Sequence, residues 1–327
     1  MKILIAYQGI IPVTNYGGTE RVIWYLGKEL NKLGHAVTFL VNKGSHCDFG
    51  KVIFIDSTKS LTAQIPEEID IVHFNFFPSE EITKPYIITM HGNINDDRKF
   101  HLNTVFVSEN HADRFGSKAF VHNGLDWDDY QKPSLNNTRS YYHFLGNAAW
   151  RVKNVQGAIK IIHQTKREKL KVLGGTRLNF NMGFRFTTSP RINFYGMVGG
   201  VKKFSLLNGS KGLVFPVRWH EPFGLAITES LFFGCPVFGT PHGSLSEIVN
   251  SEVGFLSTKS IELKDAIEFQ NNFSAKFCNE YAVENFNSKK MTLQYLEKYS
   301  TVLNGRTLNA INPSLKQIQT EKFLLFE

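Results

Sequence analysis

Two glutamates, Glu221 and Glu229, stand on either side of a Pro-Phe-Gly turn in the segment Trp219–Glu229. The pattern from Thr228 to Phe233 predicts a helix after this turn. The first turn of a helix has free backbone N–H groups and carries the positive end of the helix dipole. A phosphate in front of that N-terminus is therefore well bound, and a preceding glycine lets it approach closely. Carboxylates only accept hydrogen bonds, so they suit vicinal hydroxyls. The segment therefore predicts a ligand built from a sugar, a diphosphate and a ribose, although either glutamate alone would also suit a helix start without any ligand.

The passage Val214–Gly239 resembles the Glu-x7-Glu signature of retaining, nucleotide-sugar-dependent glycosyltransferases of family 4, which have the GT-B fold. It contains His-Glu-Pro-Phe-Gly-Leu and a helix end with Phe-Gly-Cys-Pro-Val, and Gly-Ser-Leu-Ser-Glu-Ile follows at 243–248. The resemblance implies that Glu221 binds hydroxyls of the donor sugar and that Glu229 binds those of the ribose. It also places four residues of the turn at the donor: Pro222, Phe223, Gly224 and Leu225.

Cations for the diphosphate are expected just after the predicted strand Tyr142–Leu145. In family 4 a glycine there is followed by an arginine, with a lysine several residues on, and Lys153 stands at the matching distance from Gly146. Asn147 occupies the arginine position, and an amide supplies hydrogen bonds but no charge. We expect Arg151 or Arg218 to compensate, although Arg151 would also suit an ordinary surface position.

Glycine-rich loops after other strands add candidate donor contacts. Gly17 and Gly18 precede a predicted helix, where glycine lets the backbone approach a ligand closely; they resemble the family's Gly-Gly-x-Glu loop, and a tight turn is the alternative. Phe194–Gly199 resembles the element that holds the nucleoside, which implies that the backbone of Met197 and Val198 pairs with the base. Apolar residues at such positions also serve simply as core.

The first half contributes His91, in Thr-Met-His-Gly after the predicted strand Tyr86–Thr89. It matches the His-Gly of the family, which implies that its imidazole orients the donor sugar and is not a general base. Ser108 and Glu109 resemble the segment that shapes the acceptor pocket. A helix N-cap at Ser108 explains the same residues equally well.

Strands and helices alternate through both halves, which predicts parallel sheets covered on both faces. With the resemblance, this predicts an α/β protein of GT-B fold, with two Rossmann-like domains facing each other across a cleft. The expected domains are an acceptor-side domain at 1–138, a donor domain at 139–300 and a C-terminal segment at 301–327. Leu315, Ile318, Phe323, Leu324 and Phe326 are expected to extend a return of that segment to the first domain.

Charge is distributed unevenly over the 327 residues, whose net charge is +8. Residues 1–140 hold 14 Lys and Arg against 16 Asp and Glu, whereas residues 141–327 hold 23 against 13. The second half therefore suits an anionic ligand. No nucleic-acid motif accompanies this charge, so nucleic acid is not expected as a partner. Three scattered cysteines indicate a reducing compartment, and no apolar run is long enough to span a membrane.

These patterns predict a retaining glycosyltransferase that transfers a sugar from a UDP- or GDP-sugar to a glycan, lipid-linked or small-molecule acceptor. The aspartate pairs at 96–97 and 128–129 are adjacent and lie in polar loops, so no metal site and no cofactor are expected. The resemblance implies surface polysaccharide or lipopolysaccharide synthesis in the cytoplasm, with peripheral membrane contact left open and the oligomeric state undetermined. A GT-B-like nucleotide-sugar epimerase and a catalytically inactive nucleotide-sugar-binding protein are the alternatives.

Overall fold

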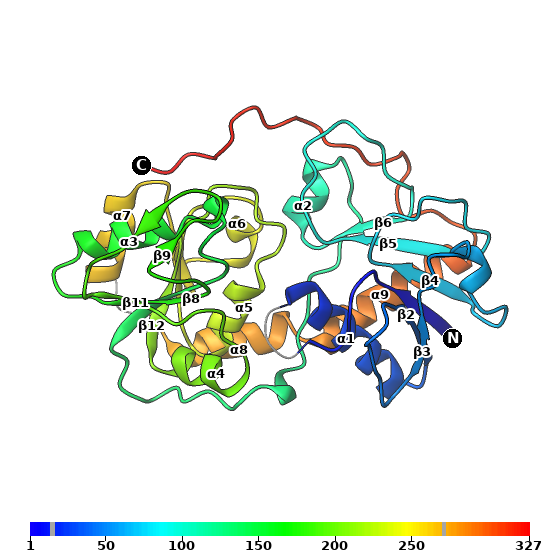
Figure 1. Cartoon of the computed structure of the whole chain (residues 1–327), viewed down its shortest axis with the longest axis horizontal. Helices are drawn as coiled ribbons and strands as arrows, with labels where there is room; N and C mark the ends of the chain where they lie inside the picture. The colour runs from blue at the N-terminus through cyan, green and yellow to red at the C-terminus, as the bar shows by residue number, and fades with distance from the viewer. Residues whose placement is uncertain (14–16, 270–272) are drawn as a thin grey trace. The chain divides into compact units, whose positions relative to one another are not determined.

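The computed structural model describes residues 1–13, 17–269 and 273–327 (Figure 1). The described chain divides into two compact units. The first holds Met1–Val13, Gly17–Trp127 and Phe286–Gln319, and the second holds Asp128–Asn285 and Thr320–Glu327. The chain therefore returns to the first unit at Phe286 and passes back to the second unit after Gln319.

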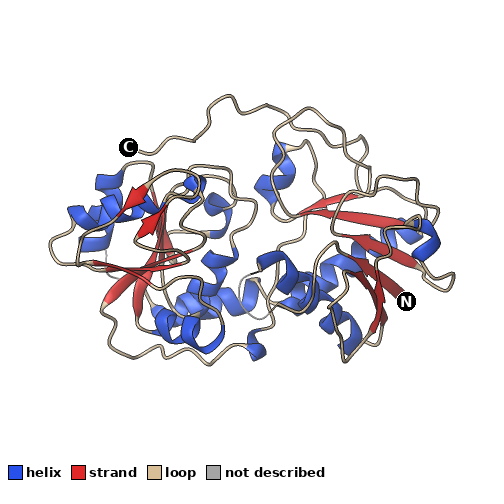
Figure 2. Ribbon diagram, viewed as in Figure 1, coloured by secondary structure: helices blue, strands red, loops and turns tan. Residues whose placement is uncertain are grey.

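The first unit is built on a parallel sheet of order β3-β2-β1-β4-β5-β6. Except for the edge strand β3, its strands are fully or largely buried apolar runs, as a sheet covered on both faces requires, and Figure 2 shows helices beside it. Its elements are β1 (Lys2–Ala6), α1 (Gly18–Lys32), β2 (Ala36–Val41), β3 (Lys51–Phe54), η1 (Thr62–Gln64), β4 (Ile71–Phe74), β5 (Tyr86–Met90), β6 (Thr104–Phe106), α2 (Glu109–Arg114) and α9 (Ser288–Leu303).

Helix α9 is fixed to this sheet by a buried polar cluster. The two ring nitrogens of His73 lie 2.7 Å from the hydroxyls of Tyr299 and Thr89, and the Thr89 hydroxyl lies 2.9 Å from that of Tyr295. Burial lowers the pKa of His73 to about 3, so the ring is neutral at pH 7. Since each buried polar group has a partner, the cluster stabilises the docking of α9 on β4 and β5.

The second unit repeats the plan with a parallel sheet of order β11-β8-β7-β12-β13-β14. Helix α3 packs on α7, and α5 packs on α8. Its elements are β7 (Tyr141–Leu145), η3 (Arg151–Lys153), α3 (Val155–Gln164), β8 (Leu170–Leu173), β9 (Leu178–Asn179), β10 (Arg185–Phe186), β11 (Ile192–Phe194), α4 (Gly200–Asn208), β12 (Ser210–Phe215), α5 (Leu225–Phe232), β13 (Val237–Gly239), α6 (Leu245–Ile248), β14 (Gly254–Leu256), α7 (Ser260–Phe269) and α8 (Ala275–Asn285), with η2 (Trp127–Asp129) at the junction of the units.

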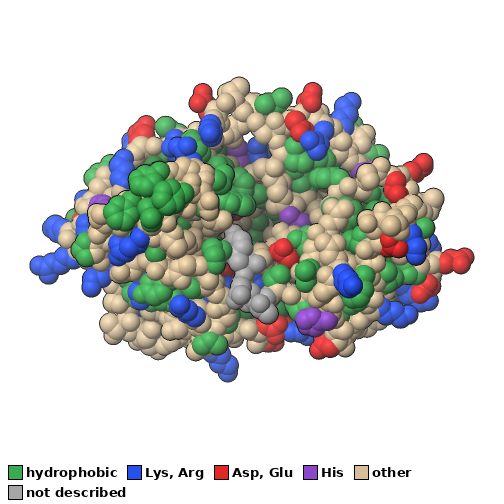
Figure 3. Space-filling view, viewed as in Figure 1, with side chains coloured by type: hydrophobic (Ala, Val, Ile, Leu, Met, Phe, Trp, Pro, Cys, Tyr) green, Lys and Arg blue, Asp and Glu red, His purple; other side chains and the backbone are tan. Residues whose placement is uncertain are grey.

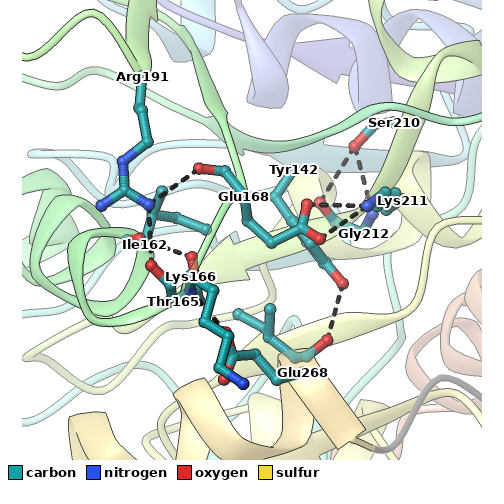
Figure 4. A network of polar contacts seen from close by, with 11 residues as sticks. Tyr142, Ile162, Thr165, Lys166, Glu168, Arg191, Ser210, Lys211, Gly212 and Glu268 are labelled. Carbon is teal, nitrogen blue, oxygen red and sulfur yellow. Dashed lines mark hydrogen bonds and ion pairs between the residues drawn. The ribbon is translucent and has the colours of Figure 1, made fainter.

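A polar network closes the amino ends of these strands (Figure 4). Lys211, at the start of β12, forms an ion pair at 2.8 Å with Glu168, which precedes β8. Arg191, which precedes β11, donates to the carbonyl of Thr165 at 2.9 Å, and Tyr142 of β7 donates to the carbonyl of Ile267. These side chains are used to hold the sheet together, so the opposite, carboxyl edge is the one available for a ligand.

The two predicted strands Tyr86–Thr89 and Tyr142–Leu145 agree with β5 and β7 to within one residue. The tail differs from expectation. Leu315 is buried in the first unit, next to Phe100 and Phe115, and Ile318 is exposed there. Phe323, Leu324 and Phe326 were expected to extend the return to the first domain, but they contact the second unit, where Leu324 exchanges two hydrogen bonds with Arg218. A backbone pairing of this kind is invisible in the apolar pattern of the tail.

Candidate functional site

The candidate site of the second unit lies where the strand order reverses. Strands β7 and β12 are neighbours in the sheet, and β8 and β13 continue from them in opposite directions. Ligands of open α/β sheets bind at the carboxyl ends of strands beside such a switch point. The loop after β7 carries Gly146–Lys153, and the loop after β12 carries Pro216–Gly224. The topology therefore brings two segments predicted from sequence to one edge.

Lys153 and Glu221 meet at this switch point. The Lys153 ammonium lies 2.6 Å from the Glu221 carboxylate, whose same oxygen accepts the indole N–H of Trp219 at 2.8 Å. The side chains are only 12% and 6% exposed. The ammonium also lies 4.8 Å from the centroid of the Trp219 ring, within cation–π range. A buried cation and a carboxylate thus hold each other at the front of helix α5.

Glycines give the Glu221 loop its shape. Gly224 is the N-cap of α5 and adopts φ 84°, which favours glycine. Gly243 has φ 66°, and a Cβ there would collide with the backbone of Glu221. The amide of Ser244 donates to the carbonyl of Glu221, and its hydroxyl donates to that of Phe223. Helix α5 begins at Leu225, three residues before the predicted start, because the left-handed Gly224 directly precedes a helical turn.

The second signature residue, Glu229, is 2% exposed inside α5. Its carboxylate lies 2.5 Å from the ammonium of Lys203 and accepts the hydroxyl of Tyr130 at 2.8 Å. Sequence reasoning missed both partners, which come from α4 and from the segment after η2. The Val-Lys-Lys sequence opening α4 was the available signal, but a lysine is normally solvent-exposed. Glu229 therefore pairs with the buried Lys203, and Glu221 with the largely buried Lys153.

The remaining candidate cations are arranged around the C-terminal tail. The guanidinium carbons of Arg151 and Arg218 lie 5.0 and 5.1 Å from the centroid of the Phe323 ring. The Asn147 side chain accepts from the amide of Ala149 at 3.0 Å, so it stabilises its own turn. The structure thus places Lys153 with Glu221, and Arg151 with Arg218.

The loops after β8 and β11 complete this edge. A Cβ on Gly174 would collide with the carbonyl of Gly146, so the two loops touch backbone to backbone. Met197 is 46% exposed and Val198 is partly buried in the loop after β11. Pro222 and Phe223 are buried, whereas Leu225 is partly exposed.

In the first unit, His91 follows β5 and contacts Asn75, which follows β4. The Asn75 amide N–H₂ donates to the carbonyl of Ala6, so its oxygen faces the His91 Nε2 at 2.8 Å. Nε2 must then carry the proton, which leaves Nδ1 as an acceptor. Burial lowers the pKa of His91 to about 4, so the ring is neutral at pH 7. The geometry suits a group that accepts a hydrogen bond from a ligand hydroxyl.

The other candidates of the first unit lie at helix starts. Gly17 is the N-cap of α1 and Gly18 is its first residue; the Gly17 carbonyl accepts from the Arg21 side chain. The Ser108 hydroxyl caps α2 by accepting from the amide of His111 at 3.1 Å, which is the structural alternative considered for it. Glu109 is exposed in the first turn of α2.

Across 1–13, 17–269 and 273–327, no group of three or more His, Cys, Asp or Glu side chains is arranged to hold a metal ion. Within the same ranges, no helix combines the length and the apolar character needed to cross a membrane.

The two Rossmann-type sheets, each in its own α/β unit, define the GT-B fold. Solved structures with this fold include AviGT4, a glycosyltransferase involved in avilamycin A biosynthesis, which is 19% identical with a TM-score of 0.74 over 94% of this chain and 99% of that one. Sucrose-phosphate synthase from Thermosynechococcus elongatus is 17% identical, with a TM-score of 0.71 over 93% and 99% of the two chains. Anabaena HepE, in complex with UDP and glucose, is 17% identical, with a TM-score of 0.64 over 92% and 100%.

A sequence model of the family described as glycosyl transferases group 1 matches residues 139–269, which lie in the second unit. No curated protein matches the chain in sequence. The group 1 domain together with the GT-B fold identifies the protein as a glycosyltransferase.

Proposed function

We propose that the protein is a retaining, metal-independent glycosyltransferase of family 4 that uses a UDP- or GDP-sugar. The observation that carries this proposal is the Lys153–Glu221 pair, buried at the switch point in front of helix α5. A similar fold is described in complex with UDP and glucose, which supports a nucleotide-sugar donor. The excess of basic residues in the second half supports an anionic donor as well.

The chemical problem is to break the bond between the anomeric carbon and the diphosphate. Negative charge develops on the departing phosphate, and preorganised charges and dipoles stabilise it best. Lys153 and the start of α5, at Phe223, Gly224 and Leu225, supply them in this proposal. Glu221, which pairs with Lys153, binds hydroxyls of the donor sugar in this proposal. When the diphosphate arrives, it competes with Glu221 for the ammonium.

Retention follows from attack on the face that the diphosphate leaves. The acceptor oxygen bonds to the anomeric carbon, the carbon–phosphate oxygen bond breaks, and the acceptor proton passes to the departing phosphate oxygen. His91 accepts a sugar hydroxyl through Nδ1 and stays neutral, so it orients the donor without taking the proton. This role uses the tautomer that Asn75 enforces.

The other assignments remain those the resemblance implies. Glu229 binds the ribose hydroxyls, and the backbone at Met197 and Val198 contacts the base. Arg151 or Arg218 supplies the second cation. Gly17 and Gly18 in the first unit approach the diphosphate or the acceptor, and Ser108 and Glu109 shape the acceptor pocket. The acceptor is a glycan, a lipid-linked species or a small molecule, in surface polysaccharide or lipopolysaccharide synthesis in the cytoplasm.

Donor hydrolysis tests the proposal. The protein is incubated with a panel of UDP- and GDP-sugars, and release of the nucleoside diphosphate is measured, with the anomer of the released sugar followed by NMR. We expect turnover of at least one donor with retention, and a loss of about 100-fold or more in Glu221→Gln. Glu252→Gln makes the same change on the surface of the same unit and should match the wild type.

Tight nucleotide binding without any turnover would instead support the binding-protein alternative. The local hydrogen bond of Asn147 is the observation that favours it, because that side chain replaces a charge with a turn-forming amide. Release of an epimerised sugar, without transfer or retention, would support the epimerase.

A further inference from the structure

The hairpin β9–β10 directs its apolar side chains toward solvent. Phe180, Met182, Phe184 and Phe186 are 72%, 63%, 68% and 60% exposed, and Leu178 is exposed beside them. The alternate residues Arg185 and Thr187 are buried. A strand normally turns its apolar set inward and its polar set outward. Figure 3 shows hydrophobic side chains gathered over this hairpin.

Hydrogen bonds hold the hairpin in this inverted orientation. Arg177 donates to the carbonyls of Thr187 and Ser189, both at 3.1 Å, and Arg185 donates to the carbonyl of Thr176 at 3.0 Å. At the tip, the Asn179 amide donates to the carbonyls of Asn181 and Gly183. These side chains therefore stabilise the hairpin backbone in the orientation that exposes its apolar residues.

The stretch of sequence that contains the hairpin is strongly basic. Residues 169–220 contain nine Lys and Arg and no Asp or Glu. Lys203 and Lys211 are paired with carboxylates from outside this span. Arg177 and Arg185 bond to neutral groups, and neither has an ion pair among the described residues, so their charges stay uncompensated.

A pocket of about 250 Å³ opens beside the hairpin tip. Its walls include Met182 and Phe184 from the hairpin, the guanidinium groups of Arg151 and Arg218, and the Phe323 ring. Apolar side chains and cations thus line the same pocket. This combination fits a phosphate headgroup above its acyl chains, because aromatic rings favour the interface and cations attract anionic lipids.

We propose that the hairpin Thr176–Thr187 docks the protein on an anionic lipid bilayer, with its apolar face inserted at the level of the headgroups. A second copy of the chain is a poorer occupant, because it would bring the pocket arginines Arg151, Arg185 and Arg218 of two copies together, and these like charges repel. The proposal does not depend on which donor the enzyme uses. It assigns the membrane contact to the second unit; Arg151 and Arg218, which line the pocket, are also the candidates for the second diphosphate cation.

Vesicle flotation of the full chain tests the proposal. We expect binding to vesicles in which roughly a third of the lipid is anionic, and at least tenfold weaker binding to purely zwitterionic vesicles. The double substitution Phe180→Ser and Phe184→Ser should reduce binding about tenfold or more. Phe269→Ser is the matched control, because that phenylalanine is 70% exposed on α7 of the same unit. Raising the salt to roughly 0.5 M should weaken binding, since screening shortens the reach of the basic residues.

A milder variant guards against misfolding of the double substitution. Phe184→Trp keeps an aromatic ring at the tip, and its fluorescence should shift to the blue when anionic vesicles are added. Equal binding by the wild type and the double variant, or no binding to either vesicle, would overturn the proposal. A concentration-dependent dimer that the double substitution abolishes would also overturn it, in favour of self-association.

Discussion

The candidate site is tested most sharply by measuring two effects of the Lys153–Glu221 pair separately: its contribution to folding stability and its contribution to donor hydrolysis. Lys153→Met leaves the Glu221 carboxylate, 6% exposed, without its cation. Removing one partner of a buried pair costs about 3–5 kcal/mol, because the other charge stays buried. Glu221→Gln keeps an oxygen that accepts from Trp219 or from Lys153, so we expect a smaller loss of about 1–3 kcal/mol.

Combining Lys153→Met with Glu221→Gln removes both charges. The double variant should therefore be more stable than the sum of the single losses predicts, by about 1–3 kcal/mol. Hydrogen exchange in urea, followed on peptides from β7 and β12, reports the second unit alone. Donor hydrolysis should stay at background in the double variant, although its stability recovers.

Lys276 and Glu280 provide the control pair. They lie 3.7 Å apart one turn along α8 and are 75% and 60% exposed, so their coupling should not exceed about 0.5 kcal/mol. If the losses at Lys153 and Glu221 add to within about 0.5 kcal/mol, the two side chains do not interact and the reasoning fails. Full activity in the double variant would show that the pair is structural and that the leaving group is stabilised elsewhere.

Three further predictions concern other parts of the molecule. Glu229→Gln should weaken nucleotide binding about tenfold or more in calorimetry, because an amide accepts less strongly from ribose hydroxyls; unchanged affinity would refute the ribose assignment. Tyr299→Phe should cost about 1–3 kcal/mol in urea unfolding by depriving His73 of a partner, whereas Tyr86→Phe, whose hydroxyl has no hydrogen bond within the described residues, should cost less than about 0.5. Acid should destabilise the first unit more than the second, because burial lowers the pKa of three histidines in the first unit and of one in the second to about 3–4: His73, His91, His111 and His143. Below about pH 6.5 the unfolded chain binds protons at these histidines while the native chain does not. Each histidine therefore leaves the folding free energy of its unit unaffected above that pH and makes the unit about 2 kcal/mol less stable at pH 5. Equal losses of hydrogen-exchange protection in the two units would contradict this.

The alternation of strands and helices was accessible from sequence for a physical reason. Strands buried on both faces must be continuous apolar runs, such as Ile71–Phe74 and Leu170–Leu173, and helices between them show a period near 3.6. The hairpin β9–β10 was not predicted, although residues 178–187 alternate apolar and polar side chains as a strand does. No local pattern shows that the apolar set faces solvent. Helix α4 was missed because a buried lysine interrupts its apolar face.

The candidate site divides in the same way. Glu221, Gly224 and Glu229 are recognisable because their function and backbone geometry depend on a local turn and the helix that follows it. Lys203 and Tyr130 could not be assigned to Glu229 from sequence, since they reach it from separate elements. The resemblance pointed to Lys153, but only the structure shows that its ammonium pairs with Glu221, which lies on another strand's loop.

The sequence by itself determined the two Rossmann-like sheets and the turn before α5, because burial patterns and glycine conformations act over a few residues. Tertiary structure decided which distant groups meet, because the strand order places the ends of β7 and β12 side by side. It also decided that Phe323, Leu324 and Phe326 lie on the second unit and that the hairpin turns its phenylalanines outward. Those outcomes depend on backbone hydrogen bonds between segments far apart in the chain, which no local pattern records.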